Sequence, residues 1–265
     1  MKNRKKWLWT IPLCVVLLCA GALGVYCAVE GAGGLLSLFA AIDRTDMMQA
    51  QVYEDPGGTV LPYRIYQPEN PALVQKPLVL YLHGAGESGN DNRAQTKKNS
   101  VMQTLLNKEN LAQFPCIVVA PQNPEGRWWA DEGMPQVLMG LLEQLKITHP
   151  VDPSRIYITG ISMGGYGTWE MLAAYPDFFA AAVPICGGGN PDSATRFKDV
   201  PVWAFHGARD NIVPPEGSRG IVQALEAAGA KDVRYTEYPG ERHQSWEKAY
   251  REPDLFPWMF AQVKE

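Results

Sequence analysis

Short apolar runs alternate along this chain with segments of helical spacing, and this alternation constrains the fold more than any other feature. Runs of four to seven apolar residues are typical of parallel strands buried on both faces. The runs expected to form such strands are residues 78–82, 116–120, 155–161, 180–186, 202–205 and 233–238. The segments expected to form helices are residues 100–107, 135–147, 163–174, 216–228 and 255–263. The sequence predicts a doubly wound α/β domain with a mostly parallel sheet and helices on both faces.

An antiparallel hairpin is expected to open this domain. Residues 49–53 and 60–67 resemble strands, and the turn sequence Asp55-Pro56-Gly57-Gly58 separates them. No internal repeat or composition break marks a second domain, and the 265 residues leave no room for a large cap domain. We expect one α/β domain over residues 46–265, with a linker at residues 31–45.

The amino terminus carries a targeting pattern. Four basic residues lie within the first six positions, and residues 7–29 then carry no charge. A basic flank before an apolar run is typical of a signal peptide or a membrane anchor, and this run exceeds the roughly 20 residues that span a bilayer. Residues 1–30 are thus expected to be a signal peptide or a transmembrane anchor, with the remainder exported across the membrane by the positive-inside rule.

Composition argues against several classes of function. The 24 Lys and Arg against 28 Asp and Glu make a net charge of −4, which does not attract phosphate backbones, so no nucleic-acid partner is expected. The four histidines are scattered, and neither an H-E-x-x-H motif nor a cysteine pair is present, so we expect no metal and no cofactor. Cys116 and Cys186 end different apolar runs and are interpreted as two buried thiols rather than a disulfide.

The run Gly160-Ile161-Ser162-Met163-Gly164 predicts a catalytic nucleophile. It follows an expected strand and precedes an expected helix, which is the setting that gives the G-x-S-x-G pattern its meaning. The sharp turn strains the serine backbone and presents its hydroxyl above the sheet, and the glycines allow strand and helix to approach. Ser162 is therefore the candidate nucleophile.

A serine nucleophile needs a histidine base and an acid that orients it. His243 lies in a polar loop after the last expected strand, whereas His83 and His206 precede glycines at strand ends and His149 lies at a helix end. Asp210 follows the expected strand at 202–205, and the chain order Ser162, Asp210, His243 is that of an α/β-hydrolase. Asp192 is the alternative acid.

The negative charge that develops on the carbonyl oxygen needs two N–H donors. We expect one from Met163, which follows the nucleophile. The second is expected from Ala85, in the loop His83-Gly84-Ala85-Gly86-Glu87 after the strand at 78–82.

Four segments carry a family resemblance: LHGAGESGNDN (82–92), GISMGGYGTW (160–169), FHGARDNIVP (205–214) and HQSW (243–246). They resemble the α/β-hydrolase superfamily, and more narrowly the extracytoplasmic esterases and "predicted peptidases" related to dienelactone hydrolase, polyhydroxybutyrate depolymerase and feruloyl esterase. The resemblance implies nucleophile, acid, base and oxyanion roles for the residues named above, and ester hydrolysis as the activity. Dienelactone hydrolases proper use cysteine as the nucleophile, and this chain has Ser162.

Aromatic residues near the expected site suggest a platform for the substrate. Trp128 and Trp129 follow the strand at 116–120, while Tyr166, Trp169 and Trp246 lie close in sequence to the nucleophile or the base. They could bind an aromatic acyl group or an acylated carbohydrate; packing in the core is the alternative. The expected function is a serine carboxylesterase, with a peptidase using the same triad or a surface-anchored binding module as alternatives.

Overall fold

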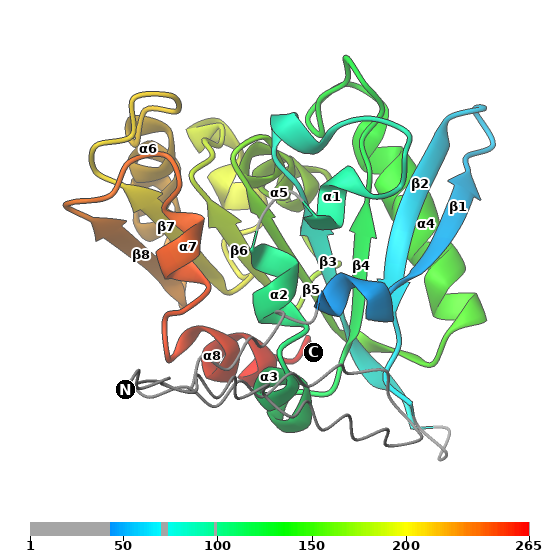
Figure 1. Cartoon of the computed structure of the whole chain (residues 1–265). Helices are drawn as coiled ribbons and strands as arrows, with labels where there is room; N and C mark the ends of the chain where they lie inside the picture. Colours follow the sequence, from blue (N-terminus) through cyan, green and yellow to red (C-terminus); the bar gives the residue numbers. More distant parts are fainter. Residues whose placement is uncertain (1–42, 70–73, 98–99, 265) are drawn as a thin grey trace, which may run out of the picture. The chain divides into compact units, whose positions relative to one another are not determined.

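An eight-stranded sheet runs through the centre of the protein (Figure 1). The computed structural model describes residues 43–69, 74–97 and 100–264, and the described part from Asp43 onward forms a single unit. The strands follow the order β1-β2-β4-β3-β5-β6-β7-β8 across the sheet. Their bounds are β1 (Gln49–Glu54), β2 (Val60–Tyr66), β3 (Lys76–Leu82), β4 (Ile117–Pro121), β5 (Val151–Ile161), β6 (Ala181–Ile185), β7 (Val202–Gly207) and β8 (Val233–Tyr238).

The strands from β3 to β8 run parallel, and the predicted hairpin β1–β2 continues the sheet in antiparallel fashion beyond β4. The turn between β1 and β2 uses Gly58, whose φ of 87° favours glycine. Parallel strands end at the same edge of a sheet, so the residues that follow β3, β5, β6, β7 and β8 gather there. The predicted site residues directly follow these strands in the sequence, so they are expected at this edge.

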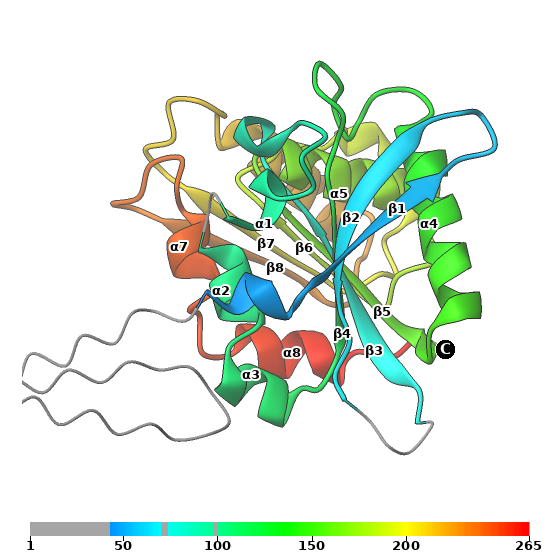
Figure 2. The ribbon, with the colours of Figure 1, turned by 45° about the vertical axis from the view of Figure 1, so that its right-hand side comes forward.

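Helices cover both faces of the sheet, as predicted. Alternate residues of β3 point to opposite faces: Leu80 packs in one hydrophobic core and Tyr81 in the other. Figure 2 shows α4 and α5 on one side of the twisted sheet and α2, α3 and α8 on the other. The helices are α1 (Ala94–Lys97), α2 (Val101–Leu105), α3 (Lys108–Gln113), α4 (Met134–Thr148), α5 (Met163–Ala174), α6 (Glu216–Ala227), α7 (Trp246–Ala249) and α8 (Leu255–Ala261).

The predicted α/β architecture is confirmed, with no large cap domain within the described residues. The prediction missed the helices α1, α3 and α7, which have four to six residues and no room for a full apolar repeat. Cys116 and Cys186 are free and buried, so the interpretation as two thiols is confirmed.

The predicted signal peptide or anchor at residues 1–30 lies outside the described residues, as does most of the linker at 31–45. Within the described part of the chain, no helix is long and apolar enough to cross a membrane.

Candidate active site

Ser162 lies in the sharp turn between β5 and α5. Its backbone has φ 53° and ψ −115°, a left-handed conformation that a non-glycine residue adopts only under strain. The turn is held from below, because the Ser162 N–H donates to Ile185 O at 3.0 Å and lies 3.3 Å from Cys186 Sγ. The strand, the strained serine and the helix form the strand–turn–helix arrangement that the sequence predicted around Ser162.

Two glycines make this turn possible by allowing the backbone to pass at close range. A Cβ atom on Gly164 would lie 1.9 Å from Leu82 O, and one on Gly160 would lie 2.3 Å from Gly164 O. Real Cβ atoms do not approach backbone oxygens so closely. The glycines on either side of Ser162 are therefore required by the packing of β5 and α5 against β3.

The structure brings Ser162, His243 and Asp210 into one chain of hydrogen bonds. Ser162 Oγ lies 2.9 Å from His243 Nε2, and His243 Nδ1 lies 2.7 Å from Asp210 Oδ2. Because Asp210 accepts at Nδ1, that nitrogen carries the ring proton and Nε2 is free to accept the serine proton. The three residues follow β5, β7 and β8, whose carboxyl ends share one edge of the sheet.

Backbone hydrogen bonds hold the His243 loop against the loop that carries Asp210. The Ala208 N–H donates to Tyr238 O at 3.0 Å, and the Arg209 N–H donates to Glu241 O at 2.9 Å. The imidazole of His243 also packs edge-on against the Trp246 ring, with 5.5 Å between the ring centroids. The position of the imidazole is thus set by both its loop and a neighbouring ring.

Asp210 is a buried carboxylate whose two oxygens are well supplied with donors. Oδ1 accepts from the N–H groups of Ile212 and Val213 at 2.9 and 3.0 Å, and Oδ2 accepts from His243. Burial alone would raise the pKa of Asp210, but the hydrogen bonds from His243, Val213 and Ile212 together lower its pKa below the usual value. The group therefore stays ionised beside His243.

His206, which the sequence did not predict as part of the site, also contacts Asp210. Its Nε2 lies 3.2 Å from Asp210 Oδ2 and 3.0 Å from Val213 O, so this nitrogen faces two acceptors and carries the ring proton. Its Nδ1 lies 2.8 Å from Ser218 Oγ. The ring is fully buried, and burial lowers the pKa of His206. Only its position four residues before Asp210 could have revealed this contact in the sequence.

Ala85 and Met163 line one cavity of about 380 Å³ beside the nucleophile. Ala85 begins the short 3-10 helix η2 (Ala85–Glu87), and Met163 begins α5. Within the described part of the chain, neither backbone N–H donates to a protein acceptor. The structure therefore brings the two predicted donors to the same cavity with their N–H groups available.

Buried polar contacts fix the loop that carries Ala85. Glu87 Oε2 accepts the Gly84 N–H at 2.6 Å. His83 Nε2 accepts the Asn123 N–H at 2.9 Å, which leaves the ring proton on Nδ1 to be donated to Gly84 O at 2.6 Å. The conformation of this loop is thus set from two directions by side chains at the end of β3 and in η2.

The structure separates the two adjacent tryptophans expected to line the substrate site. Trp128 is 50% exposed and meets the half-buried Tyr166 edge-on, with 6.4 Å between ring centroids. Trp129 is fully buried, and its Nε1 donates to His83 O at 3.0 Å. The two residues lie in a turn that the Asp131 N–H closes on Trp128 O at 3.1 Å, and their side chains leave it in different directions, Trp128 toward solvent and Trp129 into the core. The expectation that Trp129 lines the site therefore disagrees with its burial.

Trp246 and Asp192 complete the predicted set. Trp246 packs on His243 and against the apolar core that contains residues of α7 and α8, which is the packing expected as the alternative to substrate binding. Asp192, the alternative acid, lies exposed in the 3-10 helix η3 (Pro191–Arg196), and the carboxylate that contacts His243 is that of Asp210. Within the described residues, no group of three or more His, Cys, Asp or Glu is arranged to hold a metal ion.

Known structures resemble this arrangement over most of the chain. The crystal structure of a thermostable esterase has a TM-score of 0.79 and 38% sequence identity, and the match covers 83% of this chain and 64% of the esterase. The chain has the α/β-hydrolase fold. The predicted resemblance is confirmed, and the α/β-hydrolase sheet accounts for the strand order and for the edge at which Ser162, Asp210 and His243 meet.

The sequence is also similar to a hydrolase family and to individual proteins with esterase and depolymerase names. Residues 126–252 match the dienelactone hydrolase family. A bifunctional acetylxylan esterase/xylanase of Neocallimastix patriciarum is 27% identical, over 64% of this chain and 24% of that protein. A poly(3-hydroxyalkanoate) depolymerase C of Paucimonas lemoignei is 33% identical, over 42% of this chain and 28% of that protein. The chain spans about a quarter of the length of these curated relatives.

Proposed function

We propose that this chain is a serine hydrolase that cleaves carboxylic esters through an acyl-enzyme. The observation that carries the proposal is the continuous hydrogen-bonded path from Ser162 Oγ through the His243 ring to Asp210, with distances of 2.9 and 2.7 Å. A nucleophile in contact with a base, and a base oriented by an ionised acid, is the arrangement that activates a serine hydroxyl at neutral pH.

In the proposed mechanism, Ser162 Oγ attacks the ester carbonyl carbon while its proton passes to His243 Nε2. The tetrahedral intermediate collapses, the bond to the alcohol oxygen breaks, and the alcohol leaves with the proton from His243. Water then attacks the acyl-enzyme with His243 again acting as base, and the carboxylic acid departs as Ser162 regains its proton. Asp210 keeps its charge throughout and stabilises the His243 imidazolium.

The cavity lined by Ala85 and Met163 provides the proposed oxyanion hole. Both backbone N–H groups are available, and the Met163 N–H also lies at the amino terminus of α5, where the helix dipole favours negative charge. Loss of one such donor typically costs about 3–4 kcal/mol of transition-state stabilisation. The fixed loop around Gly84 keeps the Ala85 donor in place before the charge develops.

Ester substrates are favoured because the matched proteins carry esterase and depolymerase names. We propose a small-molecule ester with an aromatic acyl group or an acylated carbohydrate, and Trp128 and Tyr166 are the exposed and half-buried rings beside the site. We further propose that residues 46–265 act outside the cytoplasm, because the basic and apolar pattern of residues 1–30 is that of a signal peptide or anchor.

The test is a panel of esters, from acetyl to octanoyl and including feruloyl, hydrolysed by the wild-type chain and by Ser162→Ala. We expect the substitution to lower kcat by about 10⁴- to 10⁶-fold without changing the melting temperature by more than a few degrees, because the triad acts as a unit. Ser154→Ala, at the opposite end of β5, is the matched control and should hydrolyse the panel like the wild type.

Three results would contradict this proposal. Turnover of p-nitrophenyl acetate by Ser162→Ala at the wild-type rate would remove Ser162 from the mechanism. Failure of a fluorophosphonate probe to label Ser162 in the folded wild type, with no ester hydrolysed, would favour the binding module. Faster cleavage of peptide amides than of esters would reassign the same residues to a peptidase.

A further inference from the structure

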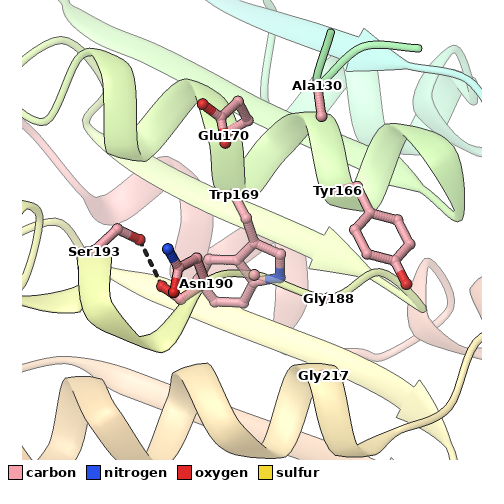
Figure 3. A pocket seen from close by; sticks show the side chains of 9 residues that line it. Ala130, Tyr166, Trp169, Glu170, Gly188, Asn190, Ser193 and Gly217 are labelled. Carbon is pink, nitrogen blue, oxygen red and sulfur yellow. Dashed lines mark hydrogen bonds between the residues drawn. The ribbon is translucent and has the colours of Figure 1, made fainter.

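A second cavity of about 300 Å³ opens beside the nucleophile helix (Figure 3). Tyr166 and Trp169 of α5 form one side of it, and the segment Gly188–Asn190 after β6 forms the other. The exposed side chains of Glu170 and Asn190 contribute polar atoms to its lining. The cavity is at the lower end of the size range of ligand pockets, which suits a single ring.

One wall of this cavity holds a buried donor without an acceptor. Trp169 is only 2% exposed, and its Nε1–H has no hydrogen-bond partner within the described residues. The other buried tryptophans each donate from Nε1, Trp129 to His83 O, Trp203 to Thr236 Oγ1 and Trp258 to Asp232 Oδ2. An unpaired buried N–H costs about 1–3 kcal/mol, so this one calls for an explanation.

The nitrogen-bearing edge of Trp169 turns toward the Gly188 side of the cavity, where Tyr166 also lies (Figure 3). A Cβ atom on Gly189 would lie 2.9 Å from Trp169 Cγ, and one on Gly188 would lie 3.1 Å from Tyr166 Cε1. The absence of side chains at these positions leaves a slot between the two rings and the glycine segment. The nitrogen-bearing edge of the indole is turned toward this slot, and the Nε1 atom itself is buried in the slot wall.

The slot lies one helical turn from the proposed nucleophile. Tyr166 follows Ser162 by four residues on α5, and its N–H donates to Ser162 O at 3.1 Å. On the opposite wall, Gly188 follows Cys186, whose Sγ lies 3.3 Å from the Ser162 N–H. Both walls of the slot are thus joined to Ser162 through the backbone of α5 and of the segment after β6.

We propose that this slot receives a ring of the ester substrate that carries an oxygen substituent, and that Trp169 Nε1–H donates to that oxygen. The inference rests on the proposed ester hydrolysis and names the part of the substrate that is selected. The ligand chemistry is a ring hydroxyl or ether oxygen, which a phenolic acyl group and a sugar both offer. Glu170 and Asn190 supply a carboxylate and an amide for further hydroxyl groups.

The test compares matched substrates on the wild type and on Trp169→Phe, which removes the N–H and keeps a ring. Ethyl 4-hydroxycinnamate against ethyl cinnamate tests the phenolic source, and an acetylated methyl glycoside against cyclohexyl acetate tests the sugar source. We expect the wild type to prefer the oxygen-bearing member of one pair by about tenfold in kcat/KM, because a site with a buried donor rejects a ligand that leaves it unpaired. The variant should lose that preference.

Trp258→Phe is the matched control, because its indole donates to Asp232 and does not line the slot; it should keep the wild-type preference. Equal preferences in the wild type and Trp169→Phe for both pairs would overturn the inference and leave water as the partner of the donor.

A binding measurement tests the inference even if Trp169→Phe does not fold or the wild type does not hydrolyse esters. In the Ser162→Ala protein, which retains Trp169, the indole ¹H–¹⁵N signal of Trp169 should shift on titration with the oxygen-bearing ester and not with its bare analogue. No shift with either oxygen-bearing ester would also overturn the inference. Absence of hydrolysis by the wild type, together with this shift, would instead contradict the proposed function and leave the binding site standing.

Discussion

At the scale of single residues, the arrangement around Asp210 explains how a buried carboxylate stays ionised. Its oxygens are contacted by the N–H groups of Ile212 and Val213 and by the rings of His243 and His206. Each donor offsets part of the loss of hydration. His206 is in turn held by Ser218, whose hydroxyl also lies 2.7 Å from Gly187 O. The acid is positioned by this set of contacts as a whole.

The contribution of His206 can be separated from simple packing by comparing His206→Leu with His206→Gln. Leucine removes an N–H that faces Asp210 Oδ2, so protonation of the carboxylate is favoured and the acid limb of the kcat/KM profile should extend to higher pH. Because the carboxylate also loses a contact that positions it against His243, kcat/KM at neutral pH should fall about tenfold. Glutamine offers an amide N–H and should restore much of the profile. The profile is measured by ester hydrolysis between pH 4 and 9.

The charged and titratable groups near His206 and Asp210 are His243 and, farther away, Glu237 with its partner Arg219. The Ser218 hydroxyl also contacts His206. Both variants lack the His206 ring, and only glutamine keeps an N–H, so recovery of the profile with glutamine is the decisive comparison. Acid limbs that coincide in the wild type and both variants would remove His206 from the positioning of Asp210.

At the scale of the element, β5, the turn and α5 act as a rigid unit whose shape depends on glycine. Gly164 lies where α5 passes the end of β3, with Leu82 O only 1.9 Å from the position of a Cβ atom. A strained serine persists only where its surroundings hold it, and here the sheet on one side and the helix on the other do so. Stability and the proposed chemistry share these contacts.

Gly164→Ala should therefore destabilise the fold by about 3 kcal/mol or more, because β3 and α5 must move apart to admit a methyl group. Gly220→Ala is the matched control: it lies inside α6, where the nearest atom to an added Cβ is Pro191 Cγ at 3.6 Å. That change should stabilise the chain by about 0.5–1 kcal/mol through helix propensity. Urea unfolding measures both, and equal stabilities of the two variants would contradict this account of the turn.

At the scale of the whole molecule, the sheet gathers residues that are far apart in the chain. The strands β3, β5, β7 and β8 run parallel, so their carboxyl ends bring the Ala85 loop, Ser162, Asp210 and His243 to one edge. The hydrophobic cores on its two faces hold the sheet. The buried imidazole and carboxyl side chains of the described residues, His83, Glu87, His206 and Asp210, lie at the edge where the site is.

The burial of two histidines, His206 at this edge and the half-buried His149 at the opposite end of the sheet, predicts how stability depends on pH. Burial lowers the pKa values of His206 and His149 below 6.5, so below that pH the unfolded chain binds protons that the folded chain does not. Stability should fall as the pH drops from 7 through 6.5 toward the lowered folded-state values. The lowered pKa of Asp210 adds a loss below its unfolded value near 3.8.

Melting temperatures recorded from pH 8 to pH 5 should therefore decrease toward acid pH, and the decrease should be smaller in His206→Gln, which has one buried histidine fewer. A melting temperature that stays constant or rises between pH 7 and pH 5 would show that these groups do not titrate as their burial requires.

The sequence by itself determined the alternation of strands and helices, the turn around Ser162 and the order of Ser162, Asp210 and His243, because each follows from local spacing and from residues placed directly after strands. Tertiary structure alone decided which side chains meet. Trp128 and Trp129 are neighbours with the same chemistry, yet one is exposed and the other buried, since burial depends on what packs across from each. The contact of His206 with Asp210 and the unpaired Trp169 donor likewise arise from chain segments that meet only in the folded sheet.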